Sequence, residues 1–259
     1  MALVTVERHA RGIVRVVMNH VEARNAMGEA LRGELLELLQ PLLGESSTRV
    51  LVFASALPNF SVGGDLSRMD TLSDPKEGRK RIQSAHRLLR LLLATGIPMI
   101  AEVRGHAVGA GAGLALLCDT LVMAEGASIG FPFPKVGLAP DFGVAYTLQR
   151  RIGPAAARQA LLYARSYGAA DALAIGLADE VVPDADLQAR ALQRAEELAA
   201  LPSLALQLTK RMLEASTDAE AVLNAEALSQ PLCFASDDFR EGLEAFRQKR
   251  KPHFDPGVA

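Results

Sequence analysis

Hydrophobic and polar positions in the first half of the chain follow two periods, one typical of strands and one typical of helices. Five apolar or alternating runs predict strands: 3–8, 13–18, 49–55, 98–103 and 120–124. The first two are expected to form a hairpin around Gly12. Three segments with helical character lie between these strands: 27–43, 79–95 and 110–118. Because strands and helices alternate, this half predicts an α/β architecture.

The second half of the chain has a different pattern. Beyond residue 140, seven segments rich in Ala, Leu, Glu and Arg predict helices: 142–151, 154–163, 169–176, 184–200, 203–215, 218–233 and 236–248. No low-complexity linker separates this helical part from the part that carries the strands. The sequence therefore predicts an α/β unit that continues into a helical region.

Charge and residue usage narrow the possible functions of the 259-residue chain. The formal net charge is −2 and tryptophan is absent, so neither a nucleic-acid partner nor an anionic membrane is expected. No uninterrupted apolar run reaches the ~18 residues of a membrane span, and the first ten residues lack the apolar stretch of a signal peptide. The five histidines have no metal-binding spacing, and the two cysteines form no Cys-x-x-Cys pair. We expect a cytoplasmic protein without a bound metal.

Glycine-containing turns follow two of the predicted strands, and the chemistry is expected there. The first is 60–66 (FSVGGDL), and the second is 105–113 (GHAVGAGAG), which leads into a helix. Glycine lets a backbone approach a ligand closely, and the amino end of a helix carries free N–H groups with a partial positive charge. If the two turns converge, they form an oxyanion hole, in which each donor is worth roughly 10²–10³-fold in rate.

The glycine-containing segments also admit other interpretations. A glycine-rich turn by itself is more often a tight connection than a catalytic element. A dinucleotide-binding G-x-G-x-x-G pattern fails because Leu114 occupies its last glycine position. Residues 126–130 (GASIG) match the G-x-S-x-G elbow of serine hydrolases, but Pro132 and Pro134 oppose the helix that must follow the serine.

Four elements in order resemble the enoyl-CoA hydratase/isomerase (crotonase) superfamily over nearly the whole chain. They are 22–27 (EARNAM), 60–66 (FSVGGDL), 105–111 (GHAVGAG) and 246–252 (FRQKRKP). The corresponding family patterns are E-A-R-N-A, F-x-x-G-x-D-L, G-x-A-x-G-G-G and a final segment that contacts coenzyme A. Any one of these is a weak signal, but four in the expected order and spacing are specific.

The resemblance implies a fold and an assembly. The fold is a spiral of ββα units over residues 1–195, followed by a C-terminal helical trimerisation region over residues 196–259. The assembly is a homotrimer or a hexamer made of two trimers. The substrate is an acyl-CoA, so coenzyme A arrives as part of the substrate and no tightly bound cofactor is expected.

The resemblance also implies site residues. By motif position the oxyanion donors are the main-chain N–H groups of Gly64 and Ala110, where Ala110 replaces a family glycine. Asp65 is implied to hold its own turn rather than to catalyse, and Lys249 to reach coenzyme A phosphates from a neighbouring subunit. The residues implied to contact the acyl-CoA are Ala23, Asn25, Val62, Asp65, Leu66, Phe133 and Lys249.

The acidic residues distinguish between reactions, because fold alone does not fix the chemistry. Hydratases of the family use two glutamates, but their motif positions here hold Gly113 and Phe133. Without those acids no obvious group activates water. Residues 140–143 (PDFG) resemble the P-D-x-G element of an isomerase subgroup, which makes Asp141 the candidate base, although a Pro-Asp pair before a helix is also ordinary capping chemistry.

We therefore predict an acyl-CoA isomerase that shifts a double bond from the Δ3 to the Δ2 position, including the possibility of a ring-derived CoA ester. Asp141, Gly64 and Ala110 carry the reaction in this prediction. The alternative is a hydratase-like protein that binds acyl-CoA without turnover, because both hydratase glutamates are missing. Decarboxylation and thioester hydrolysis also stay open.

Overall fold

The computed structural model describes residues 2–65, 74–215 and 218–254. Six strands form the main sheet, in the order β1-β2-β3-β4-β6-β9. The first pair is antiparallel and the other pairs are parallel. These strands are β1 (Val4–His9), β2 (Ile13–Met18), β3 (Val50–Ser55), β4 (Met99–Val103), β6 (Thr120–Ala124) and β9 (Glu180–Val182).

A smaller sheet of three strands lies beside the main sheet, in the order β5-β7-β8. Its members are three residues each: β5 (His106–Val108), β7 (Ser128–Gly130) and β8 (Ser166–Gly168). The sequence pattern did not predict these strands or β9, because three residues are too few to show a period. The longer predicted strands are all confirmed, within one or two residues at their ends.

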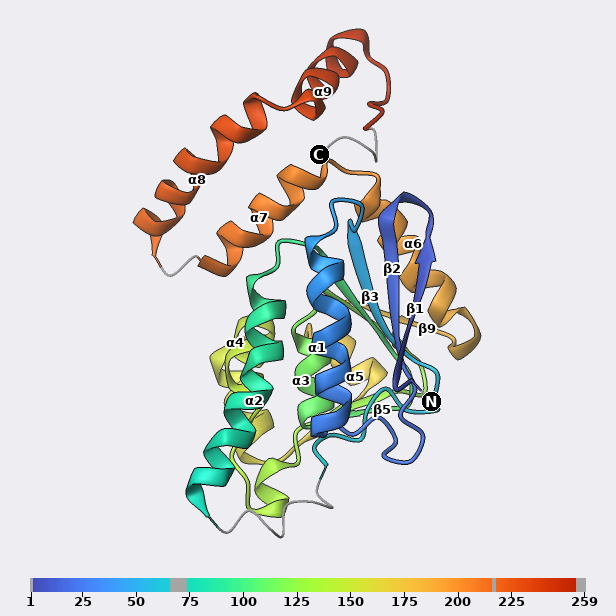
Figure 1. Cartoon of the computed structure of the whole chain (residues 1–259), viewed down its shortest axis with the longest axis vertical. Helices are drawn as coiled ribbons and strands as arrows, with labels where there is room; N and C mark the ends of the chain where they lie inside the picture. The colour runs from blue at the N-terminus through green and yellow to red at the C-terminus, as the bar shows by residue number, and fades with distance from the viewer. Residues whose placement is uncertain (1, 66–73, 216–217, 255–259) are drawn as a thin grey trace.

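Helices cover the main sheet and extend away from it at one end (Figure 1). The helices of the core region are α1 (Glu29–Gly44), α2 (Pro75–Ala94), α3 (Ala110–Leu116), α4 (Val144–Leu162), α5 (Ala169–Ala174) and α6 (Leu187–Ala199). The last three are α7 (Ser203–Ala215), α8 (Ala219–Phe234) and α9 (Asp237–Gln248), and Figure 1 shows them projecting beyond the sheet. The two helices predicted over 142–151 and 154–163 are confirmed as the two parts of α4, which the non-helical Gly153 (φ 77°, ψ 159°) separates.

The division predicted after residue 195 falls inside a helix. α6 continues to Ala199, which is buried, and it packs on β3 and β4 of the main sheet. α7 then begins after the turn at Leu201 and Pro202. The division into a core and a trimerisation region stays a prediction.

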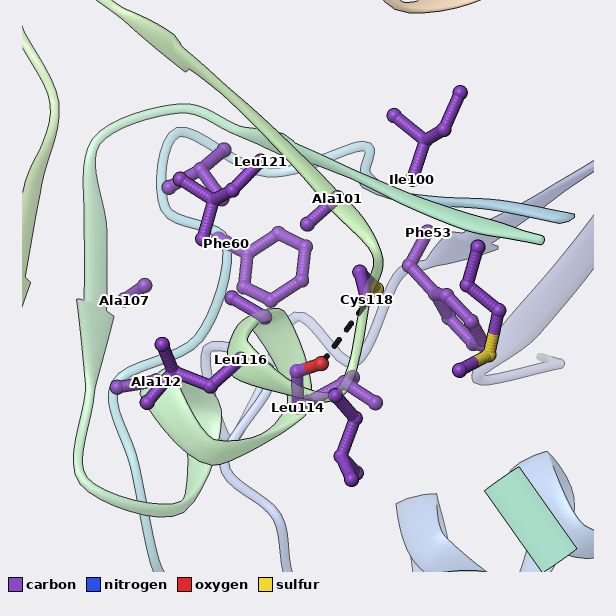
Figure 2. Close-up of a cluster of buried hydrophobic side chains, with 14 of the residues drawn as sticks. Phe53, Phe60, Ile100, Ala101, Ala107, Ala112, Leu114, Leu116, Cys118 and Leu121 are labelled. Carbon is purple, nitrogen blue, oxygen red and sulfur yellow. Dashed lines mark hydrogen bonds between the residues drawn. The ribbon is translucent and has the colours of Figure 1, made fainter. Parts of the chain in front are cut away.

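The core forms where the parallel strands meet their covering helices. Every residue of β3 and β4 is buried, as expected for strands covered on both faces. Figure 2 shows Phe53, Phe60 and Leu114 in this cluster, with Cys118 among them. The Cys118 thiol donates to the Leu114 carbonyl at 3.7 Å, and burial raises the pKa of this thiol, so it serves as a packing residue.

Candidate functional site

A short parallel bridge joins the two glycine-containing turns. Ser61 pairs with Ala107, the Val108 N–H donates to the Ser61 carbonyl at 3.0 Å, and the Ser61 N–H donates to the His106 carbonyl at 3.0 Å. The residues that follow, Gly64 in one turn and Ala110 in the other, line the same cavity. The two turns therefore converge, as the sequence predicted.

Glycines allow this close approach. Gly63 has φ 103°, and a Cβ there would lie 2.9 Å from the Val108 carbonyl oxygen. At Gly111 a Cβ would lie 2.5 Å from both the Cβ and the Oγ of Ser61. Since real Cβ contacts are not this short, a side chain at Gly111 would push the two turns apart.

We expect Gly111→Ala to destabilise the protein by about 1–3 kcal/mol, because it overpacks the junction of the two turns. Gly33→Ala is the matched control, since Gly33 lies inside α1 with open space around it. Alanine is the better helix former there, so this variant should gain about 1 kcal/mol. Urea unfolding of both variants measures the difference, and equal midpoints would contradict the close-approach argument.

Ala110 is the first residue of α3, and its position explains how it can replace a glycine. It is not among the residues with positive φ, so a Cβ causes no backbone strain there. The first N–H groups of a helix have no intrahelical acceptor. The N–H of Ala110 therefore stays available to a ligand oxygen.

The cavity that contains both donors also contains the predicted base. Its volume is about 300 Å³, and it lies between α1, α2, the start of α3 and the loop before α4. Asp141, Gly64 and Ala110 all line it, so the three predicted catalytic groups share one cavity. The other lining residues are Met27, Arg32, Gly78, Arg81, Ile82, Ala85, Leu138, Ala139 and Phe142.

One oxygen of the Asp141 carboxyl group has no hydrogen-bond partner within the described part of the chain. Among the described residues its Oδ1 is buried and unpaired. The helix cap of α4 is Gly143, with no side-chain cap bond, so the capping role considered for Asp141 is not found. The next two residues, Phe142 and Gly143, have φ of 51° and 74°, and this tight turn directs Asp141 into the cavity.

The electrostatic surroundings of Asp141 act in opposite directions. Burial raises the pKa of its carboxyl above the ordinary aspartate value, and the nearby cations Arg32 and Arg81, together with His86, reduce that rise. The net direction is upward. A carboxyl with a raised pKa is a stronger base than a free aspartate, as proton abstraction requires.

The two positions expected to carry hydratase glutamates are closed or apolar. A Cβ at Gly113 would lie 2.8 Å from the Phe142 carbonyl oxygen and 3.0 Å from the Phe142 Cβ. Phe133 is buried, and its ring lies beside Gly109, the residue before the second donor. Phe133 is not among the residues that line the cavity, and its contact with an acyl-CoA stays a prediction.

Asn25 was expected to contact the acyl-CoA, but its side chain holds the loop together instead. Its Oδ1 accepts from the His20 N–H at 2.7 Å, and its Nδ2 donates to Ser55 Oγ at 2.8 Å. Its carbonyl accepts from Ser61 Oγ at 2.6 Å. With no exposed surface and its polar groups engaged, Asn25 positions the first turn, and we correct its assignment accordingly.

The other predicted contact residues lie at different places. The Val62 N–H donates to the carbonyl of Arg24, the residue after Ala23, at 3.4 Å. Neither Ala23 nor Val62 lines the cavity, so their contact with coenzyme A stays a prediction. The carbonyl of Asp65 accepts from Arg81 at 3.0 Å. Lys249 is exposed at the end of α9, in the projecting region. Leu66 lies outside the described residues.

Sequence reasoning missed two arginines of this site. Arg32 lies next to Leu31 in α1, and Arg81 lies in the first half of α2. Arg32 shares a helix face with Leu35 and Leu39, and this placement is a signal that the sequence did contain, because charged residues are rarely buried without a role. Arg81 carries no comparable signal.

The serine-hydrolase pattern does not have the required geometry. Ser128 lies in β7 at the start of a strand of the small sheet, not on a turn between a strand and a helix. Its Oγ lies 2.8 Å from His106 Nδ1. In the described part of the chain no group of His, Cys, Asp and Glu residues could hold a metal ion, and no helix there is long and apolar enough to cross a membrane.

Comparisons with known proteins agree with this arrangement. The family model for enoyl-CoA hydratase/isomerase matches residues 8–257. A Rhodobacter capsulatus protein named "Probable enoyl-CoA hydratase" is 35% identical, with 95% of each chain covered. The 2,3-dehydroadipyl-CoA hydratase of Escherichia coli is 34% identical, covering 98% of this chain and 99% of that protein. The crystal structure of an enoyl-CoA hydratase from Bacillus anthracis has a TM-score of 0.92 at 27% identity, covering 98% and 99%.

Proposed function

Because this chain belongs to the enoyl-CoA hydratase/isomerase family, we propose that it is an acyl-CoA isomerase that moves a double bond from the Δ3 to the Δ2 position. Membership itself establishes an enzyme of the crotonase type that processes acyl-CoA. The observation that carries the isomerase proposal is the content of the cavity. It holds the Asp141 carboxylate together with the main-chain donors of Gly64 and Ala110.

The proposed reaction needs one mobile proton and one stabilised oxygen. The thioester oxygen accepts hydrogen bonds from the Gly64 and Ala110 N–H groups. Asp141 takes a proton from C2, and the electron pair of that C–H bond moves toward the thioester carbonyl to give a dienolate. The two donors stabilise the negative oxygen. Asp141 then returns the proton at C4, the double bond ends between C2 and C3, and no other reactant is consumed.

Hydration is the main competing reaction, since relatives such as the Rhodobacter and Escherichia coli proteins are named as hydratases. Water addition in this family relies on a glutamate pair. Position 113 has no room for a side chain unless Phe142 moves, and position 133 carries a phenylalanine. Both observations support isomerisation over hydration for this chain.

The test is a pair of assays on 3-enoyl-CoA and 2-enoyl-CoA substrates of equal chain length. We expect wild-type protein to convert the 3-enoyl ester into the conjugated 2-enoyl ester, whose absorbance is followed directly, without forming the 3-hydroxyacyl product. Rapid hydration of the 2-enoyl ester would contradict the proposal. Binding of both esters with turnover of neither would favour the non-catalytic alternative, which the missing glutamates support.

We also propose that the chain acts as a homotrimer or as a hexamer of two trimers. α8 has no buried residue in the single chain, and its large apolar side chains include the exposed Leu223, Leu228 and Leu232. Such a face is stable in water when other copies of the chain cover it. Sedimentation equilibrium that gives the mass of one chain would contradict this assembly.

A further inference from the structure

Two arginines line the cavity that holds the proposed base. Arg32 comes from the first turn of α1 and is only 7% exposed. Arg81 comes from α2 and is half-buried. A cavity for an ordinary hydrocarbon chain gains nothing from two guanidinium groups, since apolar surface is best buried against apolar surface.

Arg32 is buried with hydrogen-bonding capacity to spare. Its Nη1 donates to the Met27 carbonyl at 2.5 Å. Its Nε is buried and has no partner among the described residues. A buried unpaired donor is costly, more so on a charged group, and such a group in a native protein calls for an explanation. A ligand atom that accepts from Arg32 supplies one.

No carboxylate of the described chain forms an ion pair with either arginine. Arg81 donates to the main-chain oxygen of Asp65, as Arg32 does to that of Met27, and both of these acceptors are neutral. Asp141 lines the same cavity, yet within the described residues no salt bridge joins its carboxyl oxygens to Arg32 or Arg81. Burial, and then the charge of Arg81, lower the pKa of Arg32, while the charges of Glu29 and Asp141 act in the opposite direction without cancelling this fall.

Beyond the effect of Arg32 and Arg81 on the pKa of Asp141, the proposed reaction gives these positive charges no task. The developing oxyanion has its own main-chain donors, and the base must stay a free carboxylate to accept a proton. The charge that Arg32 and Arg81 can bind therefore belongs to a part of the substrate that does not react. Planar guanidinium groups match a carboxylate, which can accept two hydrogen bonds from one arginine.

We propose that the acyl group of the substrate carries a carboxylate, so that the substrate is the mono-CoA ester of an unsaturated dicarboxylic acid, with Arg32 and Arg81 as the residues that bind the free carboxylate. The proposal rests on the proposed function, because it assigns a ligand to the same cavity. It makes Arg32 and Arg81 specificity-determining residues rather than catalytic ones.

The test measures binding, so it does not depend on turnover. Isothermal titration compares adipoyl-CoA with hexanoyl-CoA, which share the coenzyme A part and the number of acyl carbons and differ in the terminal carboxylate. We expect wild-type protein to bind adipoyl-CoA at least about 10-fold more tightly, because hydrogen bonds to a buried charged group are worth about 10- to 100-fold in affinity. In Arg32→Met this ratio should fall to near one.

Two further variants guard against a folding artefact. Arg81→Met changes a half-buried residue and should lower the same ratio in part. Arg87→Met is the matched control, since Arg87 is an exposed arginine of the same helix that contacts Ser84 and does not line the cavity. It should keep the wild-type ratio. A general loss of binding lowers the affinity for adipoyl-CoA and for hexanoyl-CoA alike, so it leaves the ratio of the two affinities unchanged.

The outcomes separate this inference from the proposed function. Equal affinity of wild-type protein for the two esters overturns the inference, even if 3-hexenoyl-CoA is isomerised. If Arg32→Met lowers the affinity for both esters by the same factor, the inference is also overturned, because the arginine would then act on coenzyme A or on the fold. Preference for adipoyl-CoA without isomerisation of 3-hexenedioyl-CoA supports the inference and contradicts the proposed function.

Discussion

Replacing Asp141 by asparagine is expected to lower kcat for isomerisation of a 3-enoyl-CoA by about 10²–10⁴-fold, the usual range for removing a general acid–base group. The amide keeps the size and shape of the side chain but cannot accept the C2 proton. Because the carboxylate acts on a bound substrate, KM should change much less than kcat. Steady-state rates with a single 3-enoyl-CoA measure the effect.

Asp186→Asn is the matched control for this variant. Asp186 is exposed before α6, and its side chain makes no cap bond there, so the same chemical change should leave the rate within about twofold. If Asp141→Asn keeps more than a tenth of the wild-type kcat, Asp141 is not the base. The isomerase proposal would then need a different proton acceptor.

The raised pKa of Asp141 gives this variant a second expected signature. The folded protein favours the protonated carboxyl, so the ionised form costs stability as the pH rises through the folded-state pKa. Asp141→Asn should therefore be more stable than wild type at neutral pH, by about 0.5–2 kcal/mol. The gain should vanish at a pH below the pKa of an ordinary aspartate, where Asp141 is protonated in both the folded and the unfolded protein. Urea unfolding at the two pH values measures it.

Replacing Ala110 by proline is expected to lower kcat by about 10²–10³-fold, because it removes one of the two donors to the thioester oxygen. Ala110 is the first residue of α3, where proline fits the helical φ and no intrahelical hydrogen bond is lost. The change therefore deletes the N–H group while it keeps the helix. Stopped-flow rates under single-turnover conditions report the chemical step alone.

Ala169→Pro is the corresponding control. Ala169 is the buried first residue of α5, it also follows a glycine, and it does not line the cavity. If both proline variants fold and only Ala110→Pro loses activity, the N–H of Ala110 is a catalytic donor. Loss of activity in both variants to the same degree would show that proline at a buried helix start disturbs the fold.

The fold could be read from the sequence wherever an element was long enough to show a period. The strand at 120–124 and the helix at 203–215 match β6 and α7 residue for residue. β5, β7, β8 and β9 could not be found, because pairing with distant residues creates these three-residue strands and no local pattern does. The break of α4 at Gly153 could be read from the sequence, because the predicted helices 142–151 and 154–163 lie on either side of it.

The candidate site could be predicted as far as its motifs extend. Gly64, Ala110 and Asp141 come from three separate segments, and the structure places them around one cavity. The role of Asn25 was misjudged, because a motif residue can serve a ligand or its own loop and only its hydrogen bonds distinguish the two. Arg32 was missed because it belongs to no motif, and its significance comes from burial beside groups far apart in the sequence.

The contact between Gly113 and Phe142 has a consequence for how this activity could change by descent. A glutamate at position 113 cannot be accepted until the turn at Phe142 has shifted. That turn also aims Asp141, so an early shift would cost the existing reaction before a new one appears. Single substitutions along the route to hydration should therefore be selected against, whichever comes first. A directed-evolution search for hydration should succeed only from libraries that vary positions 113 and 140–143 together.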